Sequence, residues 1–291
     1  MTNNLKITYL SLLKDTLLGR TYIETEAKLF YTFQAGLLKE KISLRDYYDF
    51  ENFQLIADKL ESCKREGNYL LLREKNSKNQ LIDRHDLRNI TELSHTMIGE
   101  KRMDNIQQCI ETIIKDNVPG DLIETGVWRG GAIIWMLGIL KANDVNDRTV
   151  WAADSFEGVP SPTLKQDIGF DLSKKFLPVL AVTQEEVRKN IRKYHLLDQN
   201  LKFLPGWFKD TLNTEEINKL AILRLDGDLY ESTMDALIPL YPKVSSGGFV
   251  IVDDYESCPP CKLAINEFRE QHRITEPLLR IDNHGVYWRK S

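Results

Sequence analysis

The chain has 291 residues, of which 42% are hydrophobic and 28% charged, so a packed core is expected. Its net charge is −4 and no basic block occurs, which argues against nucleic acid as a partner. No stretch approaches the ~18 apolar residues of a membrane span, we see no secretion signal, and four cysteines do not make a disulfide scaffold. We therefore expect a cytoplasmic protein that binds no membrane.

Residues 1 to about 95 are predicted to be mostly helical. Apolar residues recur at helical spacing from Ile7 to Leu17, and a second amphipathic segment covers 24–41. Ser43 is the predicted N-cap of a third segment that reaches Leu60, and the polar stretch 73–79 is predicted to be a loop. The favoured interpretation is a helical extension that packs on the main domain or on a second subunit. A lid or substrate wall is the alternative.

From Pro119 onward, short apolar runs alternate with segments of helical periodicity. The predicted strands are 122–126, 149–156, 201–204, 221–226 and 248–253, and the predicted helices are 132–140, 184–196, 208–220, 231–240 and 262–272. This alternation predicts an α/β fold with a doubly wound, mostly parallel sheet covered on both faces. Near the end of the chain, 278–281 and 286–288 flank Asp282-Asn-His-Gly285, which is typical of an antiparallel hairpin.

The stretch Asp121–Gly131 reads D-L-I-E-T-G-V-W-R-G-G. It predicts a strand that ends at Gly126, a glycine turn and the start of a helix, the unit that brings a ligand to a helix N-terminus. Glycine suits such a turn because a Cβ would block close approach of the backbone and forbid positive φ.

Acidic residues follow several of the predicted strands. In a doubly wound sheet, ligands bind outside the carboxyl ends of the strands. Here those ends carry Glu124, Gly126, Asp154, Gly206, Asp226, Asp228, Asp253 and Asp254. Asp154 stands where a carboxylate commonly accepts hydrogen bonds from ribose hydroxyls, although it could instead cap a turn. Ser155 continues into a turn that would contact the adenosine.

Asp226, Asp253 and Asp254 form a second group. The fourth and fifth predicted strands are neighbours in the common strand orders, so these carboxylates would lie close together and would raise one another's pKa values unless a cation neutralises them. Oxygen ligands favour Mg²⁺, Ca²⁺ or Mn²⁺ over zinc. The alternative is that one of the three pairs with Arg224 or caps a helix.

Cys258-Pro-Pro-Cys261 is interpreted as a loop near the site that leads into a helix. A single C-x-x-C without a second pair or nearby histidines is not a zinc site, and no thioredoxin-type strand precedes it. The five histidines form no metal-binding spacing, although His95 and His284 lie near segments of interest.

Four strings carry a more specific signal: E-T-G-V-W-R-G-G at 124–131, D-S-F-E-G at 154–158, L-R-L-D-G-D-L-Y-E-S-T at 223–233 and V-D-D-Y at 252–255. Together they resemble the macrocin O-methyltransferase (TylF-like) family. Its members are class I, S-adenosylmethionine-dependent enzymes that methylate sugar hydroxyls in antibiotic biosynthesis. The likeness covers roughly residues 92–290, whereas the segment 20–90 matches poorly.

The resemblance implies a Rossmann-like methyltransferase domain at 96–291 with a mostly parallel seven-stranded sheet, preceded by a helical N-terminal extension or lid at 1–95. It implies two cofactors, S-adenosylmethionine and Mg²⁺. The implied S-adenosylmethionine contacts are Met97, Glu124, Gly126, Asp154, Ser155, Gly206 and Trp207. The implied Mg²⁺ ligands are Asp226, Asp253 and Asp254, and Asp226 doubles as the catalytic base.

The expected substrate is a small-molecule hydroxyl acceptor, a sugar or polyol in a secondary metabolite, and the aromatic-rich N-terminal helices would suit a homodimer. Two alternatives stay open. A nicotinamide-dependent oxidoreductase could use a similar sheet, but the turn reads G-V-W-R-G-G rather than G-x-G-x-x-G. A non-catalytic binding module could keep the fold, but it would have no need of the complete carboxylate set.

Overall fold

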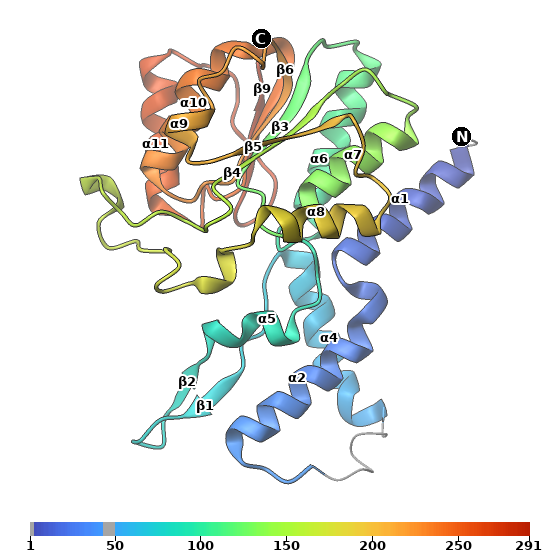
Figure 1. The fold of residues 1–291 in the computed structure, drawn as a ribbon, viewed down its shortest axis with the longest axis vertical. Coiled ribbons are helices and arrows are strands. Elements are labelled where there is room, and N and C mark those ends of the chain that lie inside the picture. Colours follow the sequence, from blue (N-terminus) through green and yellow to red (C-terminus); the bar gives the residue numbers. More distant parts are fainter. Residues whose placement is uncertain (1–2, 43–49) are drawn as a thin grey trace. The chain divides into compact units, whose positions relative to one another are not determined.

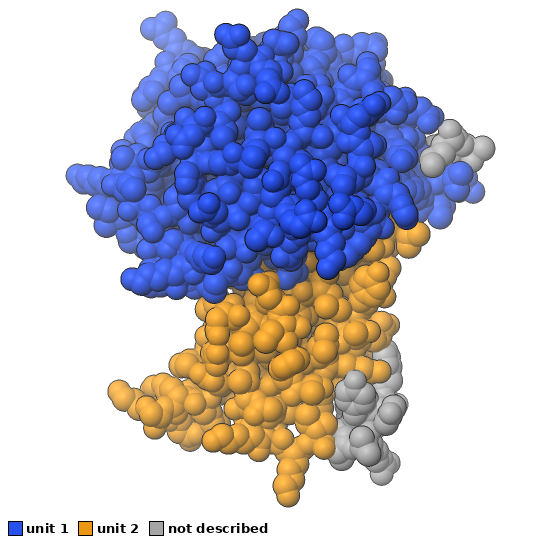
Figure 2. Space-filling model, viewed as in Figure 1, with its two compact units in different colours: residues 1–11, 101–291 blue, residues 12–100 orange. Residues whose placement is uncertain are grey.

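The computed structural model describes residues 3–42 and 50–291, so the predicted N-cap Ser43 lies outside the described residues. The chain divides into two compact units (Figure 2). One contains residues up to Ser11 together with Lys101–Ser291, and the other is Leu12–Glu100. Within the two described ranges, we find no helix whose length and apolar character would let it span a bilayer.

The larger unit is built on one seven-stranded sheet with the order β5-β4-β3-β6-β7-β9-β8. Its strands are β3 (Asp121–Thr125), β4 (Val150–Asp154), β5 (Leu201–Pro205), β6 (Leu220–Leu225), β7 (Val244–Val252), β8 (Leu279–Arg280) and β9 (Val286–Arg289). The strands from β5 to β7 pair in parallel, whereas β9 pairs antiparallel with both β7 and β8. The predicted α/β class, the mostly parallel sheet and the final hairpin are confirmed.

Helices cover both faces of this sheet, with α6 and α7 on one face and α10 and α11 on the other (Figure 1). The helices of this unit are α6 (Gly99–Lys115), α7 (Gly131–Ala142), α8 (Gln184–Lys193), α9 (Phe208–Thr211), α10 (Tyr230–Leu240) and α11 (Pro259–Gln271). All six residues of β6 are buried, which is why its sequence is a continuous run without polar alternation, apart from one arginine.

The predicted helix over 208–220 is wrong: α9 ends at Thr211. Leu212 and Ile217 are both fully buried, yet five residues in a continuous helix would place them about 140° apart. The chain turns instead. The Thr214 hydroxyl accepts a hydrogen bond from the Glu216 amide at 3.2 Å, and Lys243 Nζ donates to the Thr214 carbonyl at 2.5 Å. Local turn bonds therefore replace helical ones.

The smaller unit holds α2 (Ile23–Leu38), α4 (Phe50–Glu66) and α5 (Arg88–Thr91). Its core includes Ala27 from α2 and Phe53 and Leu60 from α4. A buried ion pair joins the same two helices, because Lys64 Nζ lies 2.8 Å from Glu26 Oε2.

The predicted loop at 73–79 is partly wrong. A short hairpin, β1 (Arg73–Lys75) and β2 (Leu81–Asp83), occupies this region of the smaller unit. Its residues are mostly exposed, so they lack the apolar alternation that marks a half-buried strand. The register places Arg73 opposite Asp83, and the two side chains form an ion pair at 2.8 Å.

A long connection, residues 155–183, joins β4 to α8, and one of its residues, Asp167, holds the start of α10 through a buried carboxylate. The side chain of Asp167 is fully buried. It accepts hydrogen bonds from the amides of Tyr230 at 2.7 Å and Glu231 at 3.1 Å, the first two residues of α10. Because the first amides of a helix have no partner within it, Asp167 caps α10 from a distant part of the chain.

Candidate active site at the carboxyl edge of the sheet

Four of the predicted site residues stand in one row just beyond the strand ends. The backbone ladder continues past β3, β6 and β7, since the amides of Gly126, Asp226 and Asp253 donate to the carbonyls of Ala153, Thr125 and Leu225, each at 2.9 Å. Asp154, at the end of β4, is next to Gly126 in this row. The sheet thus brings residues as far apart in the sequence as Gly126 and Asp253 to a single edge, where doubly wound sheets bind ligands.

A buried arginine lies at the centre of the acidic residues. Arg224 in β6 is directly opposite Glu124 in β3, so both side chains lie on the same face of the sheet. Arg224 is fully buried, and its guanidinium contacts Glu124 Oε1 at 2.5 Å, Asp226 Oδ2 at 2.7 Å and Asp253 Oδ1. The sequence left open whether an aspartate pairs with Arg224, and two of them do.

A second arginine, from α6, reaches the same cluster. Arg102 contacts Asp253 Oδ2 and also Asp282 Oδ2, the latter at 3.1 Å. The other oxygen of Asp282 accepts hydrogen bonds from the amides of His284 and Gly285 at 2.8 Å, which fixes the turn between β8 and β9. Asp253 is therefore held between two buried arginines. Neither Arg102 nor Asp282 was predicted as part of the site: no strand end or motif marks Arg102, and Asp282 was interpreted only as part of a hairpin turn.

Asp254 differs from its neighbour, because its Oδ2 is buried without a hydrogen-bond partner. Its side chain is only 8% exposed. One ligand atom from each of Asp226, Asp253 and Asp254 can be chosen so that all lie within 4.8 Å of one another. Three carboxylates at this spacing, one of them unpaired, fit a hard divalent ion, which binds oxygen ligands. The arrangement can therefore accept a cation, although Asp253 would have to share its oxygens with the arginines.

Burial raises the pKa values of the carboxyl groups around this cluster. The pKa of Glu124 is raised well above its usual value by loss of solvent, which the charge of Arg224 only partly opposes. Burial and then the charge of Asp253 raise the pKa of Asp226, and burial together with Asp228 raises that of Asp254. Burial and the charge of Asp226 raise the pKa of Asp228 to about 7. Such shifts are frequent at functional sites.

Asp154 organises the glycine turn. Its Oδ2 accepts a hydrogen bond from the Val127 amide and its Oδ1 one from the Phe156 amide, both at 2.6 Å. Within the chain, Asp154 therefore caps a turn, which is the alternative that the sequence left open. Each carboxylate oxygen can accept a second hydrogen bond, so these contacts do not prevent the predicted ribose contact, which stays a prediction.

Gly126 is required where β3 and β6 end, because a Cβ there would lie 1.8 Å from the Asp226 carbonyl oxygen and the φ is +98°. We expect Gly126→Ala to destabilise the protein by at least about 2 kcal/mol, because strain and a clash with backbone add. Gly169→Ala is the matched control, with φ +91° but nothing within 4 Å. It should cost only the ~1–2 kcal/mol of a left-handed backbone. Urea unfolding of both variants tests this, and equal losses would contradict it.

Of the remaining predicted cofactor residues, Ser155, Gly206 and Trp207 occupy the turns that follow β4 and β5. The Ser155 hydroxyl donates to the Gly158 carbonyl at 2.9 Å. The Gly206 amide donates to the Asp154 carbonyl at 2.9 Å, and Trp207 is the N-cap of α9. Met97 belongs to the smaller unit, where it lies 3.9 Å from Arg88 Nη2. Their contacts with a cofactor stay predictions.

The Cys258-Pro-Pro-Cys261 segment leads into a helix, as predicted. Cys258 is the N-cap of α11, and the two prolines occupy its first turn, where a missing amide costs nothing. Both thiols are buried and reduced. The sequence did not predict that Cys258 Sγ would donate to Asp228 Oδ1, at 3.5 Å.

Comparison with known proteins identifies the family. The family model Macrocin-O-methyltransferase (TylF) matches residues 6–290. The chain is 59% identical over 203 residues to the demethyldecarbamoylnovobiocin O-methyltransferase of Streptomyces niveus, covering 68% of this chain and 76% of that protein. It is 50% identical over 203 residues to the mycinamicin III 3''-O-methyltransferase of Micromonospora griseorubida, covering 68% and 80%. The solved structure of the O-methyltransferase NovP matches with a TM-score of 0.75 and 46% identity, over 98% of this chain and 99% of that one.

These matches confirm the resemblance carried by the four sequence strings and set aside the nicotinamide-dependent and non-catalytic alternatives. They also extend it, because the family model includes the segment 20–90, which the strings did not cover. The chain belongs to the macrocin O-methyltransferase (TylF) family.

Proposed function

We propose that this enzyme transfers a methyl group from S-adenosylmethionine to a hydroxyl of a sugar or polyol in a secondary metabolite, and that it requires Mg²⁺. One observation carries the proposal: the ligand atoms of Asp226, Asp253 and Asp254 lie within 4.8 Å of one another at the carboxyl edge of the sheet. Relatives named as O-methyltransferases of novobiocin and mycinamicin intermediates support the choice of acceptor class.

The donor would bind over the glycine turn. S-adenosylmethionine supplies a methyl group on a sulfonium when it is bound. Gly126 leaves the room that a side chain would fill, and Asp154 holds the turn through the Val127 amide. The carboxylate of Asp154 accepts from the ribose hydroxyls in this proposal, while Ser155, Gly206, Trp207 and Met97 complete the site. Glu124 Oε2 is buried without a partner, so Glu124 can accept one further hydrogen bond.

The acceptor hydroxyl would be activated beside Asp226. A hydroxyl is a poor nucleophile at its own pKa, and a bound Mg²⁺ held by Asp226, Asp253 and Asp254 supplies a positive charge that favours its ionised form. Asp226 is 26% exposed, more than Asp253 at 5%, so it is the carboxylate that can meet a substrate proton. Arg224 keeps Asp226 and Asp253 in place.

We further propose that residues 1–95 act as an extension or lid on the methyltransferase domain at 96–291, and that the enzyme forms a homodimer. Exposed apolar side chains on α1 (Asn3–Leu17) support the second point, because Leu5, Ile7 and Leu12 are 54–60% exposed.

Removal of the metal tests the proposal. We expect EDTA to lower methyl transfer to a glycosylated acceptor by at least about 100-fold, because a Lewis acid contributes several kcal/mol to such a step. Excess Mg²⁺ should restore the rate. Formation of S-adenosylhomocysteine measures the rate, and calorimetry in EDTA should show that S-adenosylmethionine still binds. Full activity in excess EDTA would refute the metal requirement.

A further inference from the structure

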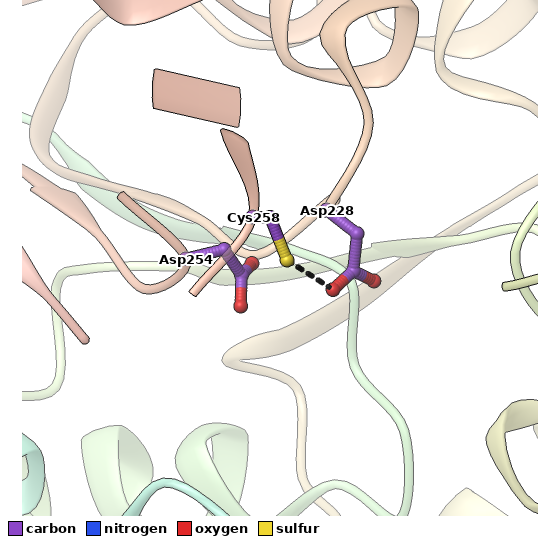
Figure 3. A group of neighbouring side chains, drawn as sticks. All are labelled: Asp228, Asp254 and Cys258. Carbon is purple, nitrogen blue, oxygen red and sulfur yellow. Dashed lines mark hydrogen bonds between the residues drawn. The ribbon is translucent and has the colours of Figure 1, made fainter. Parts of the chain in front are cut away.

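A second group of side chains that could bind a metal lies beside the proposed Mg²⁺ position, and two of its three members, Asp228 and Cys258, have no role in the function described above. It consists of Asp228, Asp254 and Cys258, from each of which one ligand atom lies within 4.8 Å of the others. Figure 3 shows the Cys258 thiol between the two carboxylates. The group shares Asp254 with the Mg²⁺ position but adds a sulfur ligand, which that position does not have.

The backbone holds these three residues in place. The Cys258 amide donates to the Asp254 carbonyl at 2.9 Å, so a single turn connects the two, and Pro259 and Pro260 then begin α11. Asp228 adopts a left-handed conformation, with φ +59°, next to a tight turn in which the Leu229 amide donates to the Gly227 carbonyl at 2.6 Å. A left-handed aspartate is uncommon and strained outside a defined turn. The three side chains therefore come from rigid segments.

The spacing agrees with a shared ion. Zinc binds sulfur at about 2.3 Å and carboxylate oxygen at about 2.1 Å, so a tetrahedral site separates the two ligand atoms by about 3.6 Å. Cys258 Sγ and Asp228 Oδ1 are 3.5 Å apart. A thiol hydrogen bond accounts equally well for this single distance, so the distance alone does not decide the matter.

The unpaired oxygen of Asp254, which is also available to the Mg²⁺ position, provides evidence that does not depend on the thiol distance. Asp254 is 92% buried, and its Oδ2 has no hydrogen-bond partner. Leaving a buried carboxylate oxygen without a partner is costly. Arg224 and Arg102 neutralise Asp226 and Asp253, but within residues 3–42 and 50–291 no lysine or arginine forms an ion pair with Asp228 or Asp254. This half of the acidic cluster therefore has no directly paired cation among the residues that the structure describes.

We propose that Asp228, Asp254 and Cys258 form a second cation position, which binds a thiophilic divalent ion such as Zn²⁺. A thiolate ligand favours thiophilic ions over hard ones. Zn²⁺ also binds sites made of nitrogen, oxygen or sulfur ligands more tightly than Mn²⁺ does. On binding, the Cys258 S–H bond breaks, the proton leaves to solvent and a metal–sulfur bond forms. Because Asp254 belongs to both positions, an ion bound here competes with Mg²⁺ for that ligand.

Cobalt binding tests this position without any measurement of methyl transfer, so its outcome is separate from that of the proposed function. The metal-free protein is titrated with Co²⁺ alone, and the near-ultraviolet thiolate-to-cobalt charge-transfer absorption is followed. We expect the band to saturate at one ion per chain. Cys258→Ser should abolish it, whereas Cys261→Ser is the matched control and should keep it, because Cys261 is outside the ligand group. Asp228→Asn, which retains the thiol, should weaken Co²⁺ binding by at least about tenfold.

Three results would overturn the proposal: no charge-transfer band in the wild-type protein, a band that persists in Cys258→Ser, or a Co²⁺ affinity that Asp228→Asn leaves unchanged. Circular dichroism of each variant checks that the fold is intact. If Cys258→Ser does not fold, the Co²⁺ titration of Asp228→Asn still tests the proposal. That substitution only changes one carboxyl group to an amide of the same size.

Discussion

Asp226→Asn is expected to lower kcat for methyl transfer by about 10³-fold or more, because a positioned general base alone contributes about 10²–10⁴. The substitution keeps the size of the side chain and removes both its negative charge and its ability to take a proton. It also removes one of the three carboxylates that would hold Mg²⁺. The rate is measured as S-adenosylhomocysteine formed with saturating donor, acceptor and Mg²⁺.

Binding of S-adenosylmethionine to the Asp226→Asn protein should largely survive, since the glycine turn and Asp154 belong to β3 and β4. Calorimetry measures it directly. Asp210→Asn is the matched control, because Asp210 is an exposed carboxylate in α9, and its turnover should equal that of the wild type. If Asp226→Asn kept wild-type turnover, Asp226 would be neither the base nor a required ligand.

Arg224→Met is expected to cause the largest loss of stability of any substitution in the sheet domain. Arg224 is fully buried and contacts Glu124, Asp226 and Asp253. Removal of one partner from a buried ion pair costs about 3–5 kcal/mol because a charge is left uncompensated. Here Glu124 and Asp226 lose their cation, while Asp253 keeps Arg102. We therefore expect the free energy of unfolding to fall by at least about 4 kcal/mol, measured with urea at pH 8.

Two further variants calibrate that loss. Arg289→Met removes an exposed pair with Asp116, in which the side chains are 42% and 37% exposed, and should cost about 1 kcal/mol or less. Arg224→Lys keeps the charge but not the planar fork that reaches several carboxylates, so an intermediate loss is expected. If Arg224→Met lowered the free energy of unfolding no more than Arg289→Met does, the buried carboxylates would not need Arg224 for their stability.

The deficit of Arg224→Met should also depend on pH. The pKa values of Glu124 and Asp226 are already raised in the folded protein, and loss of the cation raises them further. Between the unfolded pKa and the raised folded pKa, the folded state binds more protons, so stability falls as pH rises. The difference in unfolding free energy from the wild type should therefore be smaller at pH 5.5 than at pH 8. A pH-independent difference would contradict this explanation.

The sheet and the carboxylate row could be predicted because each depends on local sequence. Runs such as Leu220–Leu225 are apolar on both faces apart from Arg224, which is typical of a central parallel strand. Asp226 and Asp253 follow such runs directly, so the common edge of the sheet brings them together.

The features that were missed depend on tertiary contacts. Arg102 reaches Asp253 across 151 residues and has no sequence signal of its own. The helix α6 that carries it was not predicted, although Met103, Ile106, Ile110 and Ile113 recur at helical spacing and are fully buried. The segment 212–219 contains residues that favour helix, but the burial of both Leu212 and Ile217 overrides that preference.

Asp167 has a consequence for protein engineering. The 155–183 connection has further contacts, since Trp128 Nε1 donates to the Val179 carbonyl at 3.0 Å, but its anchor on the first two amides of α10 consists of the two hydrogen bonds of Asp167. A chimera that exchanges only 168–182 for the corresponding residues of a relative would keep this anchor. The first turn of α10 would then stay in place, and with it the spacing of the D-G-D string, Asp226-Gly227-Asp228, that precedes it.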